Sequence, residues 1–108
     1  MIIENILERT GHEVRTASGG KEALQIHMEG TIDIVVTDLR MPDGDGLELI
    51  EALRFLRPET AIIAVSGTGP RSLAEAERKG AFVAISKPID PRELLEAIAN
   101  AATRRSLT

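Results

Sequence analysis

The stretch IDIVVTDLRMPDGDGLELI, residues 32–50, decides the fold. Residues 32–37 are β-branched almost throughout, which predicts a strand buried on both faces, as in a parallel sheet. Asp38 follows directly at the carboxyl end of that strand. The next residues, MPDGDG, are turn formers, and apolar residues then recur at helical spacing to about residue 56. The stretch therefore predicts a strand, a turn and a helix.

Helices and strands also alternate in the rest of the chain. Further strands are predicted at residues 13–17 (EVRTA), 60–65 (TAIIAV) and 81–85 (AFVAI), and further helices at 2–7, 18–29, 70–79 and 90–102. Asp90 and Pro91 form a strong start for the last helix, because an acid at the N-cap and proline at the first helical position both favour it. The alternation implies a mainly parallel sheet of four strands covered by helices on both faces.

Composition limits the classes of function. With 108 residues, the chain has room for one domain and one core. Thirteen Lys and Arg against 17 Asp and Glu give a net charge of -4, which argues against direct nucleic-acid binding. The absence of cysteine excludes disulfides and cysteine zinc sites. No signal-peptide core or membrane span is evident, so we expect a cytoplasmic protein with no membrane partner.

Three chemically distinct side chains each follow a predicted strand. Asp38, Ser66 and Lys87 lie at the carboxyl ends of the strands, where parallel sheets place their binding sites. Together they suit phosphoryl transfer. The carboxylate of Asp38 would be the nucleophile, while the Ser66 hydroxyl and the Lys87 ammonium would interact with the oxygens of the phosphoryl group.

A family resemblance agrees with this chemistry. TDLRMPDGDGLELI resembles the phosphorylation loop of response-regulator receiver domains, and AVSGTG, GAFVAISKP and DPRELLEAI resemble the later receiver segments in the right order. Asp38 is followed by Pro42 and Gly46 at the family's spacing, and a distant Lys-Pro completes the pattern. The likeness covers residues 2 to 102. It implies a single receiver domain over residues 1–108 with the three-layer, flavodoxin-like (CheY-like) α/β fold.

The resemblance also implies roles. Asp38 would accept a phosphoryl group from a sensor histidine kinase or a phosphotransfer protein, Ser66 would be the switch hydroxyl, and Lys87 would pair first with Asp38 and then with phosphate. The Lys87–Pro88 bond would be cis. Asp38 and the main-chain carbonyl of Arg40 would be Mg²⁺ ligands. Such a domain is a signalling switch that alters a surface for a downstream protein partner, and it is not an enzyme in the ordinary sense.

The sequence departs from the family at its beginning. Receivers usually start with an apolar strand that ends in two acidic residues holding magnesium, and we expect both features to be absent here. The Mg²⁺ site would then be incomplete, and binding would be weak or absent. Losing that strand's buried side chains would cost roughly 10 kcal/mol. We therefore expect direct pairing of residues 13–17 with 32–37, or a homodimer that shields the gap, or a longer natural chain.

A second departure leaves a second function open. Receivers generally carry an aromatic switch residue where this chain has Ala84, and Phe82 lies two residues earlier. The alternative hypothesis is therefore a degenerate receiver that acts as a phosphorylation-independent interaction or dimerisation module. A small α/β hydrolase is disfavoured, because Ser66 has no histidine in a suitable pattern. His12 and His27 are not expected to form a metal pair.

Overall fold

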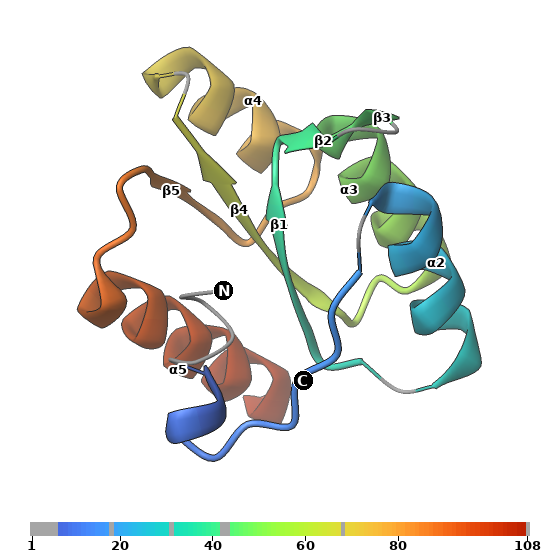
Figure 1. Cartoon of the computed structure of the whole chain (residues 1–108), viewed down its shortest axis with the longest axis vertical. Coiled ribbons are helices and arrows are strands. Elements are labelled where there is room, and N and C mark those ends of the chain that lie inside the picture. The colour runs from blue at the N-terminus through green and yellow to red at the C-terminus, as the bar shows by residue number, and fades with distance from the viewer. Residues whose placement is uncertain (1–6, 18, 31, 42–43, 68, 108) are drawn as a thin grey trace.

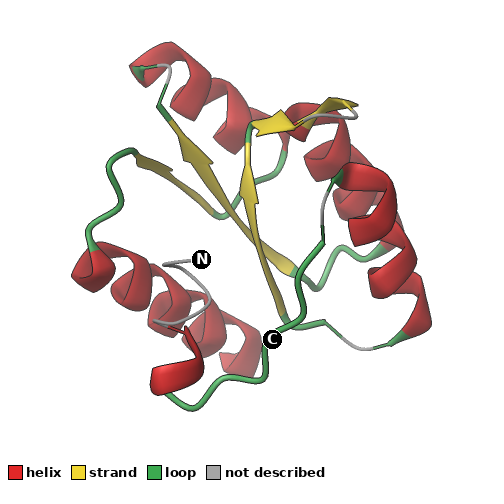
Figure 2. Cartoon of the chain, in the orientation of Figure 1, coloured by secondary structure: helices red, strands yellow, loops and turns green. Residues whose placement is uncertain are grey.

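The structure, a computed structural model, describes residues 7–17, 19–30, 32–41, 44–67 and 69–107. Its elements are α2 (Gly20–Glu29), β1 (Ile34–Asp38), β2 (Arg40–Met41), β3 (Gly44–Asp45), α3 (Gly46–Leu56), β4 (Ala61–Ser66), α4 (Pro70–Lys79), β5 (Val83–Ser86) and α5 (Pro91–Leu107). Residues 7–9 are also helical, while most of the helix predicted at 2–7 lies outside the described residues. Figures 1 and 2 show the arrangement of these elements.

The central sheet is parallel, with strand order β1-β4-β5. β4 lies in the middle, and all six of its residues are buried, because helices cover both of its faces and strands flank both of its edges. β2 and β3 form a separate antiparallel pair directly after β1. The parallel sheet predicted from the β-branched runs is therefore present.

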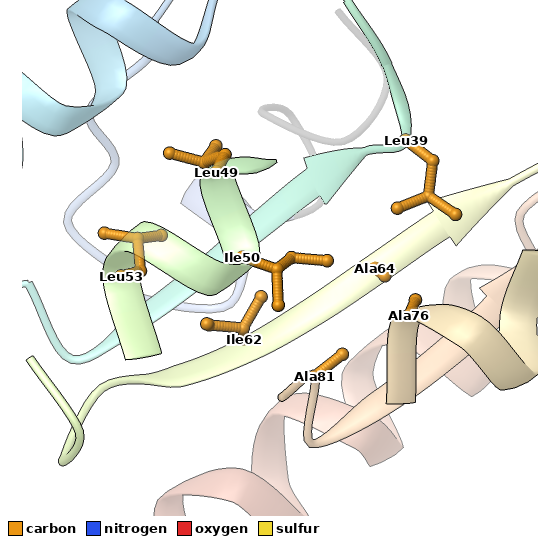
Figure 3. Packing of buried hydrophobic residues seen from close by; sticks show 8 residues of the cluster. All are labelled: Leu39, Leu49, Ile50, Leu53, Ile62, Ala64, Ala76 and Ala81. Carbon is orange, nitrogen blue, oxygen red and sulfur yellow. The ribbon is translucent and has the colours of Figure 1, made fainter. Parts of the chain in front are cut away.

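An apolar cluster lies on each face of the central sheet. On one face, α3 and α4 pack on the sheet, and α2 packs against the same apolar cluster, which Figure 3 shows: Leu39, Leu49, Ile50, Leu53, Ile62, Ala64, Ala76 and Ala81. On the other face, α5 packs on Ile63 and Ile85 through Leu94, Ala97 and Ile98. Figure 1 shows α5 on the side of the sheet opposite to α2 and α3. Ile62 and Ile63 point to opposite faces because side chains alternate along a strand, and this gives three layers.

The prediction of a strand at residues 13–17 is wrong. Residues 12–17 are irregular, and all but Val14 are exposed. The expected direct pairing with residues 32–37 is wrong as well, because β1 pairs with β4 and the described sheet has three strands where four were expected. A strand needs a neighbouring backbone to complete its hydrogen bonds. The alternation of polar and apolar residues describes only the side chains and does not show that such a neighbour exists.

Helix boundaries agree with the predictions more closely. α3 and α4 end where expected, and the described part of the first long helix begins at Gly20. At the start of α5, the carboxylate of Asp90 accepts a hydrogen bond from the backbone N–H of Arg92 at 2.9 Å, as an N-cap does. The helix runs to Leu107, five residues beyond the predicted end.

Candidate phosphoacceptor site

The carboxyl edge of the sheet brings two of the three predicted side chains into direct contact. Asp38 is the last residue of β1, and Lys87 directly follows β5. The Nζ of Lys87 donates a hydrogen bond to Oδ2 of Asp38 and forms an ion pair with it. These residues are 49 positions apart in sequence, so the contact exists only because β1 and β5 flank the same central strand.

Ser66 ends the strand between them. In the register of the sheet, Asp38 lies opposite Val65, and Ser66 is the next residue along β4. The backbone carbonyl of Ser66 accepts a hydrogen bond from the N–H of Lys87 at 2.9 Å. Ser66 is therefore held beside both charged residues by the backbone, although the residue is only 2% exposed.

The charged pair remains reachable from solvent. The side chains of Lys87 and Asp38 are 44% and 37% exposed. Solvent and solutes can therefore reach the carboxylate without opening the core. Exposure also means that the pair contributes little to stability, since exposed ion pairs give about 0–1 kcal/mol.

The backbone after Asp38 is fixed by a glycine whose role the sequence did not reveal. The N–H of Gly46 donates to the carbonyl of Leu39 at 3.0 Å. A Cβ at Gly46 would lie 2.6 Å from the carbonyl oxygen of Asp38 and 2.6 Å from Cα of Leu39. The start of α3 thus packs directly against the main chain that carries the carboxylate. The sequence signals were the position of this glycine at the end of DGDG and its spacing from Asp38, which resembles that of receiver domains.

The Lys87–Pro88 peptide bond is cis. This agrees with what the resemblance to receiver domains implied. Gly67 lies on the other side of the lysine, where an added Cβ would contact the Cβ and Cδ of Lys87 at 3.7 Å. The segments after β4 and β5 therefore run side by side at the site.

A magnesium site can be tested against the donors present. Among the described residues, no group of three or more His, Cys, Asp or Glu side chains is placed to hold a metal ion. Asp38 supplies one carboxylate, and Arg40 follows in β2 with its main-chain carbonyl. Magnesium prefers octahedral coordination by oxygen, with one or two carboxylates alongside waters and phosphate oxygens. These two donors alone do not make up such a site.

A membrane-spanning role finds no support in the described helices, none of which is both long and apolar enough to cross a bilayer.

The chain matches the family model of the response regulator receiver domain over residues 1–99. It is 33% identical to the chemotaxis protein CheY of Thermotoga maritima over 91% of this chain and 83% of that protein. It is 35% identical to the DNA-binding transcriptional regulator NtrC of Azospirillum brasilense over 93% of this chain, which spans only 21% of that regulator.

Solved structures agree on the fold. A response regulator receiver domain protein from Clostridium thermocellum is 36% identical, with a TM-score of 0.92, over 98% of this chain and 86% of that chain. A CheY-like receiver domain protein from Methanospirillum hungatei has a TM-score of 0.89 at 32% identity, over 95% of this chain and 83% of that chain. The predicted flavodoxin-like (CheY-like) fold is confirmed. The chain belongs to the family of response regulator receiver domains.

Proposed function

We propose that this receiver domain takes up a phosphoryl group on Asp38 from a phosphohistidine of a sensor histidine kinase or phosphotransfer protein. The observation that carries the proposal is the ion pair between Asp38 and Lys87 at the carboxyl edge of the sheet, with Ser66 on the strand between them. A carboxylate paired with an ammonium group, and a hydroxyl-bearing residue on the strand between them, suit acyl phosphate chemistry.

The transfer can be written from these groups. One carboxylate oxygen of Asp38 attacks phosphorus, the phosphorus–nitrogen bond breaks, and the imidazole leaves with the electron pair and takes up a proton. The ammonium group of Lys87 then exchanges its carboxylate partner for a phosphoryl oxygen. The hydroxyl of Ser66 donates to another of these oxygens, and its movement out of the buried position would alter the surface that a downstream protein recognises.

Receiver domains bind magnesium at an acidic pocket. For this chain we propose that magnesium binding is weak before phosphorylation, because the described residues offer one carboxylate, and that carboxylate is paired with Lys87. Asp38 and the carbonyl of Arg40 would hold the ion, and it would neutralise phosphoryl charge. We also propose that the domain acts in the cytoplasm.

Acetyl phosphate with magnesium tests the proposal, because this small donor needs no cognate kinase. Intact mass should show one added phosphate on the native chain and none on Asp38→Asn. Asp33→Asn is the matched control, since Asp33 is an exposed acid just before the other end of β1, and this variant should be labelled like the native chain. An unlabelled native chain, or a labelled Asp38→Asn, would oppose the proposal.

The edge position and partial exposure of β1 favour a second function. This strand lies at the end of the described sheet, and Ile34, Val35 and Val36 are only half-buried, whereas every residue of β4 is buried. An outer strand with partly exposed aliphatic side chains suits association with another chain. The domain would then serve as an interaction or homodimerisation module that needs no phosphate. Light scattering that gives a dimer mass for both the native chain and Asp38→Asn would support this function.

A further inference from the structure

A buried histidine lies at the edge of the sheet opposite the phosphoacceptor site. His27, near the end of α2, is only 2% exposed. Its Nε2 lies 3.2 Å from the hydroxyl oxygen of Thr60, which immediately precedes β4. That hydroxyl also lies 3.2 Å from the carbonyl oxygen of Ile32, shortly before β1. One chain of polar contacts thus joins the end of α2 to the beginnings of two core strands.

The contacts fix where the protons are. A carbonyl can only accept, so the single proton of the Thr60 hydroxyl is donated to Ile32. The hydroxyl oxygen must then accept from His27, which places the ring proton of the neutral histidine on Nε2. Nδ1 carries no proton in this tautomer, and it has no hydrogen-bond partner in the described part of the chain.

Protonation of the ring would disrupt this arrangement. The second proton can only go to Nδ1, which would become a buried, charged donor without an acceptor. Burial is the main cause that lowers the pKa of His27 below its ordinary value, the Arg57 guanidinium lowers it further, and the Glu59 carboxylate opposes both.

The charged side chains around the ring carry both signs. His27 lines a cleft of about 320 Å³, to which the segment between α3 and β4 contributes Arg57 and Glu59, and α2 contributes Glu29. Among the described residues lining the cleft, neither α3 nor the segment before β1 adds a charged side chain. Among the described residues, one cation and two acids therefore line the cleft beside a ring that is buried.

We propose that His27, Thr60 and the carbonyl of Ile32 form a pH-sensitive lock, which holds the end of α2 on the starts of β1 and β4 while the ring is neutral and releases it when the ring is protonated. The direction of the pH dependence of stability follows from the linkage between proton binding and folding. The folded pKa lies below the unfolded value of about 6.5, so the stabilisation is complete above that pH and is lost as pH falls towards the folded pKa.

The two histidines of the chain allow a matched test, because His12 is exposed and His27 is buried. The urea midpoint should fall between pH 7.5 and pH 5.5 in the native chain and in His12→Gln. In His27→Gln, which keeps an amide donor for Thr60, the fall should be clearly smaller. Amide hydrogen exchange of α2, corrected for intrinsic rates, should accelerate at low pH only where His27 is present.

A second set of measurements tests the proposed role of His27 if the His27→Gln variant does not fold. In the native chain, NMR titration of the His27 imidazole should give a midpoint below the ordinary histidine value of about 6.5. Thr60→Ser retains the hydroxyl and should retain the pH dependence. A His27 midpoint at or above about 6.5, or the same fall in urea midpoint in the native chain and His27→Gln, would overturn the proposal.

Discussion

Replacing Gly46 by alanine should destabilise the domain and displace the main chain at Asp38, although glycine to alanine in a helix usually stabilises by roughly 0.5–1 kcal/mol. The added Cβ would lie 2.6 Å from both the carbonyl oxygen of Asp38 and Cα of Leu39, and 3.1 Å from the carbonyl carbon of Leu39. Ordinary contact begins at 3.4 Å. The atoms it meets belong to the backbone, which cannot rotate away as a flexible side chain can.

The size of the effect follows from this clash. The main chain after β1 must move by roughly 0.8 Å, and overpacking of this kind costs about 1–3 kcal/mol. The clash should outweigh the gain in helix propensity, so Gly46→Ala should be less stable than the native chain. Because a displacement of about 1 Å can cost on the order of 10²-fold in rate, labelling by acetyl phosphate should slow at least about tenfold.

Urea unfolding and the rate of phosphate incorporation measure the two effects. Gly30→Ala is the control, because a Cβ there meets nothing within 4 Å and the residue has an extended φ of -158°. That variant should match the native chain in labelling rate. A Gly46→Ala protein that is as stable as the native chain and is labelled at the native rate would refute the packing argument.

Other substitutions separate chemistry from stability. Lys87→Ala should slow labelling while changing the free energy of unfolding by less than about 1 kcal/mol, whereas Lys79→Ala, which removes an exposed ion pair with Glu51, should leave labelling unchanged. Arg54→Ala should cost about 1.5–3 kcal/mol in urea unfolding, because its guanidinium donates to the carbonyls of Pro58 and Gly80; a native-like stability would contradict this. Ile62→Ala, in fully buried β4, should cost about 2–5 kcal/mol by calorimetry, and a smaller loss would show that the core closes the cavity.

Much of this fold could be predicted because its core strands are locally unambiguous. The β-branched runs at 32–37 and 60–65 identify buried parallel strands, and the carboxyl ends of such strands must share one edge. That reasoning places Asp38 and Lys87 together, and the structure shows them in contact. The observed strand boundaries differ from the predicted ones by one or two residues, so Asp38 and Ser66 are the last residues of their strands and do not follow them.

Other features depend on contacts that no local pattern records. The segment at 13–17 alternates like a strand, yet a strand exists only if a neighbouring backbone completes its hydrogen bonds. The buried His27 ring has its polar contact with Thr60, 33 residues away. The clash at Gly46 depends on how the start of α3 turns back onto the residue that follows β1. Expectations about a missing first strand and its acidic pair stay predictions.

The position of the phosphoryl group tests the central claim most directly. After labelling with acetyl phosphate and magnesium, borohydride reduces an acyl phosphate to the alcohol, so the modified aspartate becomes homoserine and can be located by peptide mass. The account predicts homoserine at position 38 alone, in a yield that drops when Lys87 is replaced by alanine. Homoserine in place of another aspartate, or no homoserine at any position, would contradict the account.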